Sequence, residues 1–419
     1  MHHVARSIAA TALLSVILAP LASAAGLQVL VNATPKGGVL RPPPGVYRGS
    51  IKITKPITID GGGNVEIDGE GRGSVIQIRG NGVTLRGLHI RGSGENHDTI
   101  DSGVSVRGHR NVIEDNTIDD CLFGIDLGQS NENVIRRNKI TSKPLDLGLR
   151  GDGIRLWYSR DNQIVHNEIR DVRDIVVWYS AENLIAHNTV VGGRYALHFM
   201  YSKRNRVEDN RYSENMVGVF LMYSDGVELR RNQITQGVGA TSMGVGFKES
   251  SNVLLEDNTI LRCATGIYLD ISPYEPDTNN RFVGNRIAYN SVGVVFHSDW
   301  HGNIFEGNDF DDNFTQVAVR GGGGATRHTW RGNRWADYRG FDRNRDGIGD
   351  QPYELFSYAD RFWVDRPHAA FFRASPLFEV IDMLDRLAPF TEPTLVVRDE
   401  EPRFVSEAAQ EGFRDDTGS

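Results

Sequence analysis

The chain has 419 residues, of which 39% are hydrophobic, and it carries a formal net charge of −8. A hydrophobic share of this size supports a large folded core and excludes a wholly disordered chain. The acidic balance also argues against a nucleic-acid partner, because phosphate backbones are bound by clusters of positive charge.

The first 24 residues have the pattern of an export signal. One basic residue, Arg6, precedes an apolar run that ends in the small residues Ala22, Ser23 and Ala24. Such a run with a small-residue cleavage site is typical of a secretory signal peptide. No later segment reaches the roughly 18 apolar residues that a membrane span needs. The sequence therefore predicts a signal peptide over residues 1–24 and a soluble mature protein in the periplasm.

An internal repeat, Asn-x-(Ile/Val)-x-x-Asn-x-(Ile/Val), dominates the middle of the chain. It begins with Asn111 to Ile118, and its second Asn recurs every 21 to 29 residues at Asn116, Asn138, Asn167, Asn188, Asn210, Asn232, Asn258, Asn285, Asn308 and Asn333. A second short apolar strand lies between successive copies. Strands this short cannot bury their faces alone, so neighbouring repeats must stack.

This repeat predicts an all-β, right-handed parallel β-helix of about ten or more rungs. We expect Asn at the corners, since it tolerates a left-handed backbone and stacked Asn side chains can form a hydrogen-bonded ladder. Leucine-rich repeats fit less well, because Leu is sparse and no helical pattern fits inside a repeat. Cys121 and Cys263 fall six rungs apart, roughly 29 Å, so we expect buried thiols and no disulfide.

Several stretches outside the general repeat resemble the NosD family. They are Pro44 to Tyr47, Ile67 to Gly69, Gly87 to Gly94, Leu197 to Ser202, Phe220 to Ser224 and Asp346 to Asp350. The resemblance covers residues 27–395. It implies a periplasmic accessory protein for copper-site assembly in nitrous oxide reductase, held at the inner membrane by its complex with an ABC-type permease and its ATPase. A copper-chaperone lipoprotein and the reductase itself are the other implied partners.

Aligning the rungs reveals an outward patch of methionine, histidine and tryptophan. The inward positions are apolar in every copy, so period-2 alternation turns Trp178, His198, Met200 and Met222 outward. Thioether and imidazole donors suit Cu(I), and Trp178 could cover the ion with its ring face. The alternative is an apolar strip that the C-terminal segment or a partner covers, with His198 incidental.

A second candidate metal site follows the last repeat. Side-chain oxygens at Asp342, Asn344, Asp346 and Asp350, with the carbonyl of Ile348, have the spacing of a calcium loop, and Gly347 stands where the sharp turn is needed. Position 12 is Tyr353 and not Glu, so the loop departs from the EF-hand pattern. We expect a structural Ca²⁺, against the alternative of a plain acidic turn.

Beyond the repeats we expect an aromatic cap, an amphipathic helix and an acidic tail. Ser375 and Pro376 resemble the start of a helix, which either closes the solenoid or docks on the membrane partner. The predicted divisions are a signal peptide at 1–24, a capped β-helix at 25–340, the calcium-type loop and aromatic cap at 341–374, an amphipathic helix (Leu377 to Leu387) and partner-docking segment at 375–397, and a disordered acidic tail at 398–419.

A carbohydrate-active enzyme, either a polysaccharide lyase or an epimerase, is the alternative function. Such enzymes need a carboxylate pair, or a base with a cationic partner, at working distance in a groove. Asp126, Asp152 and Asp174 approach one another in the predicted register, but the chain has no Asp-Pro-His-Asp motif. We therefore expect these acids to cap strand starts and expect no catalytic residues.

Overall fold

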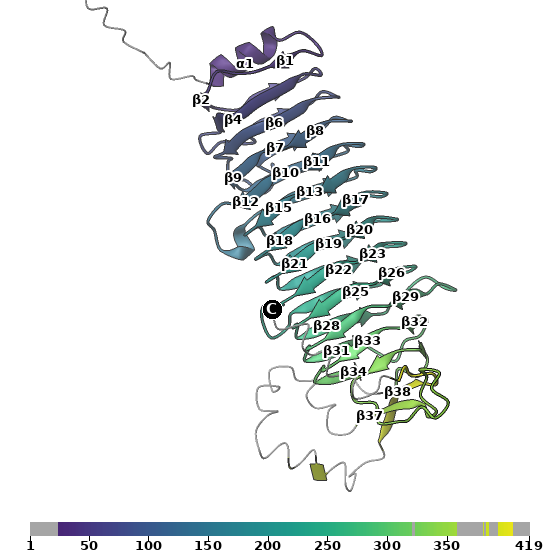
Figure 1. Cartoon of the computed structure of the whole chain (residues 1–419). Helices are drawn as coiled ribbons and strands as arrows, with labels where there is room; N and C mark the ends of the chain where they lie inside the picture. The colour runs from purple at the N-terminus through teal and green to yellow at the C-terminus, as the bar shows by residue number, and fades with distance from the viewer. Residues whose placement is uncertain (1–23, 321–322, 358–379, 381–382, 385–392, 405–419) are drawn as a thin grey trace, which may run out of the picture.

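A computed structural model describes residues 24–320, 323–357, 380, 383–384 and 393–404. The chain forms a right-handed parallel β-helix of about 13 turns, and the predicted fold class is confirmed. Figure 1 shows the strands stacked as successive rungs along one long axis. Among the described residues, no helix is long and apolar enough to cross a membrane.

One side of the solenoid is a 12-stranded parallel sheet, here called sheet B. Each rung contributes one strand to it. Its strands are β3 (Ile51–Ile53), β5 (Ile76–Ile78), β7 (Ser102–Val106), β10 (Phe123–Gly128), β13 (Ile154–Trp157), β16 (Asp174–Trp178), β19 (Tyr195–Met200), β22 (Val217–Met222), β25 (Met243–Lys248), β28 (Thr265–Asp270), β31 (Val292–Phe296) and β34 (Thr315–Val319).

The other two sides form a continuous 24-stranded sheet, sheet A, with two columns of strands. The first column comprises β1 (Val39–Leu40), β4 (Thr58–Asp68), β6 (Thr84–Arg91), β8 (Val112–Glu114), β11 (Val134–Arg136), β14 (Gln163–Val165), β17 (Leu184–Ala186), β20 (Arg206–Glu208), β23 (Glu228–Arg230), β26 (Leu254–Glu256), β29 (Asn280–Val283), β32 (Asn303–Glu306) and β35 (Thr329–Arg331). The long strands β4 and β6 also extend into the second column, whose other members are β2 (Gly45–Arg48), β9 (Thr117–Cys121), β12 (Lys139–Ser142), β15 (Glu168–Arg170), β18 (Thr189–Val191), β21 (Arg211–Ser213), β24 (Gln233–Thr235), β27 (Thr259–Leu261), β30 (Arg286–Ala288), β33 (Asp309–Asp311) and β36 (Arg334–Trp335).

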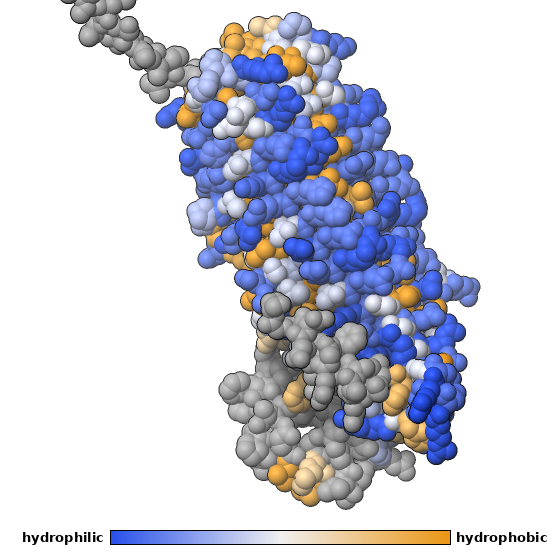
Figure 2. Space-filling model, in the orientation of Figure 1, coloured by the Kyte–Doolittle hydropathy of each residue, from blue (hydrophilic) through white to orange (hydrophobic). Residues whose placement is uncertain are grey.

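The core is a continuous column of aliphatic and aromatic side chains inside the three-sided tube. Every second residue of each strand points inward, as Ile175 and Val177 do in β16, and these residues are fully buried. The side of the solenoid seen in Figure 2 is largely hydrophilic. Cys121 and Cys263 are free and buried in this core, as predicted, and burial raises the pKa of the Cys121 thiol to about 12.

A ladder of buried asparagines runs along the corner between the two columns of sheet A. The amide oxygen of each Asn accepts hydrogen bonds from the backbone and side-chain nitrogens of the Asn one rung earlier, as between Asn167 and Asn188 at 2.9 and 3.0 Å. The ladder was predicted, but the expected left-handed backbone is not at Asn. Instead, the residue before each Asn has the positive φ, which is 57° at His166 and 56° at His187. This turn directs the Asn side chain into the tube, where it bonds to the Asn of the next rung.

Both described ends of the tube are covered. At the N-terminal end, helix α1 (Ala24–Ala33) places Leu27 and Val31 in the core. At the other end, strands β37 (Tyr353–Ser357) and β38 (Thr394–Asp399) form an antiparallel pair. Asp399 accepts hydrogen bonds from the backbone and side chain of Asn333 at 3.1 and 2.9 Å, so it ends the asparagine ladder.

This closure corrects one predicted boundary. Residues 394–397, at the end of the predicted helix and docking segment 375–397, belong to strand β38. The predicted disorder of 398–419 is wrong for residues 398–404, because Asp399 is buried against the last rung and the backbone of Arg403 bonds to Asn333. Residues 1–23 of the signal peptide, residues 358–374 of the aromatic cap, the predicted helix apart from residues 380 and 383–384, and residues 405–419 lie outside the described residues. The short 3₁₀ turn η1 (Leu147–Leu149) interrupts one corner.

The asparagine ladder yields a stability prediction. Asn188→Ala removes the acceptor for Asn167 and the donor to the carbonyl of Ile164. We expect a loss of about 2–4 kcal/mol, since each buried polar group left unpaired costs about 1–3 kcal/mol. Urea unfolding followed by circular dichroism measures it. The exposed Gln163→Ala in β14 is the control, and equal midpoints for the two variants would contradict the role given to the ladder.

Candidate functional site

The candidate site lies on the outer surface of sheet B, across strands β16, β19 and β22. Met200 pairs in register with Trp178 on one side and with Met222 on the other. His198 lies two residues before Met200 on the same face and pairs with Val176 and Phe220. The predicted side-by-side placement of Trp178, His198, Met200 and Met222 is therefore observed.

His198 points outward but is not exposed. Only 7% of its surface is accessible, because aromatic rings enclose the imidazole: Trp178 lies edge-on at 5.8 Å between ring centroids, Tyr195 at 4.9 Å and Phe220 at 6.1 Å. Val176, which lies on the same outward face of the sheet, is also fully buried. Large neighbouring rings bend over the sheet and cover the smaller side chains between them.

The His198 imidazole has no hydrogen-bond partner among the described residues, at either Nδ1 or Nε2. Burial lowers the pKa of His198 to about 4. The negative charge of Asp174 raises this pKa, whereas the positive charges of Arg194 and Arg173 lower it further. The ring is therefore neutral at pH 7 and keeps a free lone pair. A buried polar group without a partner is unusual in a folded protein, so both nitrogens of this imidazole are open to a ligand.

The surrounding donors are compatible with a soft metal ion. Met200 and Met222 are half-buried and lie on the same face of the sheet as the enclosed imidazole. The indole Nε1 of Trp178 is also buried without an acceptor in the described structure. Thioether sulfur and neutral imidazole nitrogen are ligands that favour Cu(I). The residues present thus fit copper in its reduced state.

A ladder of tyrosines borders this patch, and the sequence alone did not predict it. Tyr158, Tyr179, Tyr201 and Tyr223 stack with centroids 4.8, 5.1 and 4.8 Å apart. Each tyrosine directly follows a residue of the outward column Trp157, Trp178, Met200 and Met222. Each has a left-handed backbone with φ between 48° and 50°. The recurring Trp-Tyr-Ser and Met-Tyr-Ser triplets were the available signal, because the rung alignment already superposed their serines.

The acidic residues near the strand starts are held by arginines. Asp126 lies between Arg107 and Arg155, at 2.6 and 2.9 Å. It pairs in register with Arg155 on the next rung, and not with Asp152. Further along the face, Asp152 accepts from Arg173 at 2.8 Å.

Asp174 is bound by Arg194. Burial raises the pKa of Asp152 to about 6, and the nearby charge of Asp174 adds to that rise. The described structure thus pairs each carboxylate with a guanidinium.

The predicted calcium loop closes on itself. Asp342 accepts hydrogen bonds from the backbone of Arg345 and Gly347, and Asp346 accepts one from Ile348 at 2.8 Å. Asn344 donates to Asp346, and Asp350 accepts from the backbone of Arg343 at 2.9 Å. These bonds shape the turn with protein groups alone, and the Ca²⁺ site stays a prediction.

In the described part of the chain, no group of three or more His, Cys, Asp or Glu side chains is arranged to hold a metal. Such a group would not include thioethers, which are the donors that Met200 and Met222 supply. His97 bonds to the carbonyl of Leu149 at 3.1 Å, and His297 bonds to the hydroxyl of Tyr268 at 2.9 Å. Each of these two imidazoles therefore already has a protein hydrogen-bond partner, unlike that of His198.

Fold and site together define a parallel β-helix protein with a soft-donor patch on sheet B. The family model of NosD, described as a periplasmic copper-binding protein, matches residues 137–340. A probable ABC transporter binding protein NosD of Pseudomonas aeruginosa is 28% identical, over 98% of this chain and 99% of its own length. The protein of the same name from Stutzerimonas stutzeri is 26% identical, over 83% of each chain. The family model and both relatives support the NosD family for this chain.

Solved structures with the same fold include enzymes that act on alginate. The A-module of the mannuronan C-5 epimerase AlgE6 from Azotobacter vinelandii aligns with a TM-score of 0.58 and 17% identity, over 73% of this chain and 93% of that one. The alginate lyase AlyF aligns with a TM-score of 0.55 and 13% identity, over 75% of this chain and 84% of that one. At such low identity these likenesses show the fold alone.

The buried imidazole predicts a pH dependence of stability. The pKa of His198 is about 4 in the folded chain and about 6.5 when unfolded, so between these values the unfolded state binds the extra proton. Because protonation favours the unfolded state in this range, the stability gained from burying a neutral His198 is complete above pH 6.5 and is lost as the pH falls towards 4. From pH 7 to pH 4.5, wild type should lose on the order of 2 kcal/mol more than His198→Phe.

Urea unfolding of both proteins at the two pH values measures the difference. The other titrating groups, including Asp152, are common to both proteins and cancel. Identical pH slopes, or an NMR titration of His198 near pH 6.5, would show that the ring is not desolvated.

Proposed function

We propose that this protein is a non-catalytic periplasmic accessory protein for copper-site assembly in nitrous oxide reductase, and that it receives Cu(I) at His198, Met200 and Met222. The observation that carries the proposal is the buried His198 imidazole, which is neutral and unpartnered among the described residues, beside the half-buried Met200 and Met222. The description of the family as periplasmic and copper-binding supports the same cargo.

The geometry of the patch suits transient binding of a metal cargo. The imidazole is enclosed by three rings, while the thioethers lie at the half-buried margin where a donor protein could approach. Hydrophobic surroundings disfavour a change to Cu(II), which prefers harder and better-solvated ligands. Trp178, one rung from Met200, is placed to shield the ion from water.

The partners follow from family membership. Both relatives are named as ABC transporter binding proteins, and we infer that this chain works with an ABC-type permease and its ATPase at the inner membrane. A copper-chaperone lipoprotein would supply the ion, and nitrous oxide reductase would receive it. The aromatic and methionine column on sheet B offers an apolar surface that such a donor or client could cover.

A carbohydrate-active enzyme is the second candidate, favoured by the shared fold of the alginate enzymes. Sheet B carries three buried acids, but Asp126, Asp152 and Asp174 each form ion pairs with arginine. These ion pairs hold the acids in place near the strand starts, and the chain has no Asp-Pro-His-Asp motif of the epimerases. We therefore infer a structural role for these acids. Turnover of uronate polymers by the purified chain would reverse that inference.

Anaerobic titration with Cu(I) in competition with a chromophoric chelator tests the metal site. Wild type should bind one Cu(I), and the triple variant His198→Ala, Met200→Ala, Met222→Ala should bind at least about 10-fold more weakly, which corresponds to about 1.4 kcal/mol. Met216→Ala is the matched control, because Met216 is an exposed thioether just before β22. Equal affinity in wild type and the triple variant would refute the site.

The cellular role requires a separate measurement. In a strain that lacks this gene, nitrous oxide reductase should accumulate with its polypeptide present and its copper content reduced several-fold. Metal analysis of the purified reductase measures this, and complementation with wild type should restore the copper. Normal copper content in the deletion strain would refute the assembly role, whatever the Cu(I) affinity of the isolated chain.

A further inference from the structure

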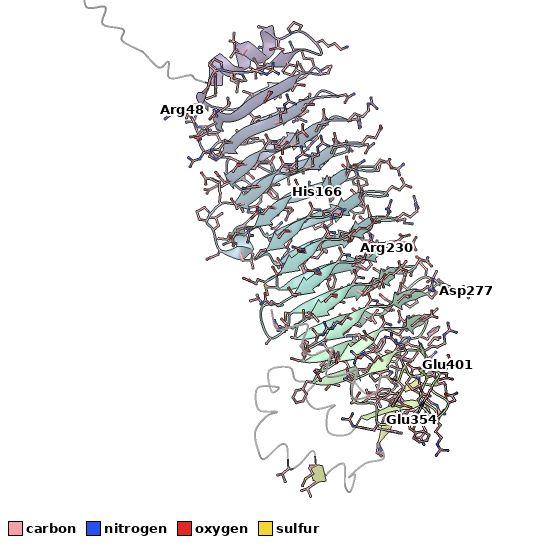
Figure 3. The ribbon with its side chains drawn as sticks, in the orientation of Figure 1. Arg48, His166, Arg230, Asp277, Glu354 and Glu401 are labelled. Atoms are coloured by element: carbon pink, nitrogen blue, oxygen red, sulfur yellow. The ribbon has the colours of Figure 1, made fainter. Side chains whose placement is uncertain are left out.

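Two histidines stack on the corner between the two columns of sheet A, away from sheet B. His166 and His187 each precede a ladder asparagine and occupy equivalent positions on successive rungs. Their ring centroids lie 4.7 Å apart with an angle of 6° between the ring planes. Both side chains are exposed, and Figure 3 labels His166 midway along the solenoid.

The residues on either side in this column are ion pairs that are already complete. One rung pair earlier, Arg137 binds Asp115 through two contacts of 2.7 Å. One rung pair later, Arg231 binds Asp209 through two contacts of 2.9 Å. Along this corner, an aspartate–arginine pair is followed by the two histidines and then by a second aspartate–arginine pair. Unlike its two neighbouring pairs, the histidine pair does not form an ion pair between its own members.

Nothing in the described structure occupies the imidazole nitrogens, for which no hydrogen bond or ion pair is found. The backbone beneath them is rigid. Flanking residues pair in register, Val165 with Ala186 and Glu168 with Thr189, and the Asn167–Asn188 hydrogen bonds lie directly below. The two Cα atoms are therefore held one rung apart, while the exposed rings are free to rotate.

This spacing suits two ligands of one metal ion. Imidazole nitrogen binds Zn²⁺ at about 2.0–2.1 Å, so two ligands of a tetrahedral ion lie about 3.3 Å apart. Parallel rings with centroids at 4.7 Å reach that separation if their outer nitrogens tilt together. Side-chain rotation can supply the tilt, because neither ring is held by another group of the described chain. Imidazole is a ligand of Zn²⁺, Ni²⁺ and Cu²⁺ and needs no sulfur neighbour to bind them.

We propose that His166 and His187 together bind one divalent transition-metal ion, Zn²⁺, Ni²⁺ or Cu²⁺, with the remaining coordination positions left to water or to an external ligand. The site differs from the His198 patch in place, since it lies on sheet A. It differs also in chemistry, since both ligands are nitrogen. It does not depend on the function proposed above.

Calorimetric titration of the full-length chain, tag-free and stripped of metal, tests the site with Zn²⁺, Ni²⁺ and Cu²⁺ in air at neutral pH. Wild type should bind one equivalent. His166→Asn and His187→Asn should each weaken binding at least about 10-fold, equal to about 1.4 kcal/mol. Asn is the chosen replacement because it tolerates the left-handed backbone at both positions.

Three controls locate the binding at the histidine pair. His301→Asn, which removes a single exposed imidazole, should leave the affinity unchanged. The His198, Met200 and Met222 triple variant should also bind the divalent ion as wild type does. The ion should raise the melting temperature of wild type and not that of His187→Asn, since binding to the native state stabilises it. No saturable binding by wild type, or unchanged binding in the two Asn variants, would leave the pair as a stack alone.

Discussion

The buried asparagine ladder is the interaction on which the rest of the structure depends. Ten side chains, from Asn116 to Asn333, bond along the axis at successive rungs. Each amide satisfies backbone groups at a corner where the chain turns and the regular sheet pairing is interrupted, and where an unpaired polar group would be costly. The ladder also sets the register, and the register decides which residues of successive rungs are neighbours.

Fixed register converts sequence spacing into side-by-side placement. Residues at equivalent positions lie one rung apart, so like side chains stack: tyrosines beside sheet B, histidines on the sheet A corner, and aromatic rings in the core such as Phe310 on Trp335 at 4.3 Å. The two candidate transition-metal sites, the His198 patch and the His166–His187 pair, both arise in this way. In each, ligands come from adjacent rungs, and the rigid backbone holds their Cα atoms in place while the side chains adjust.

The environment of a stack decides its chemistry. Around His198, three aromatic rings exclude water, and the resulting desolvation lowers the imidazole pKa to about 4. The soft thioethers stand next to it. His166 and His187 lie in solvent between completed ion pairs, so their chemistry is that of ordinary exposed imidazoles brought close together. The same residue type therefore suits a reduced, soft ion at one site and a divalent ion at the other.

The sequence by itself determined the solenoid, the ladder and the register. It did so because a short repeat with alternating apolar residues has few ways to bury its faces, and because each copy independently reports the same inward and outward positions. From that register it was possible to place Trp178, Met200 and Met222 in one column and to separate Cys121 from Cys263.

Only the tertiary structure decided burial, pairing and closure. The alternation of apolar and polar residues along a strand shows which side chains point outward, but it does not show which of them are exposed. The enclosure of His198 by Tyr195 and Phe220 depends on how these large rings lie over their neighbours. The arginine partners of Asp126 and Asp174 come from other rungs and from positions without a repeated signature. Asp399 ends the ladder from 66 residues beyond Asn333, a long-range contact that no local pattern encodes.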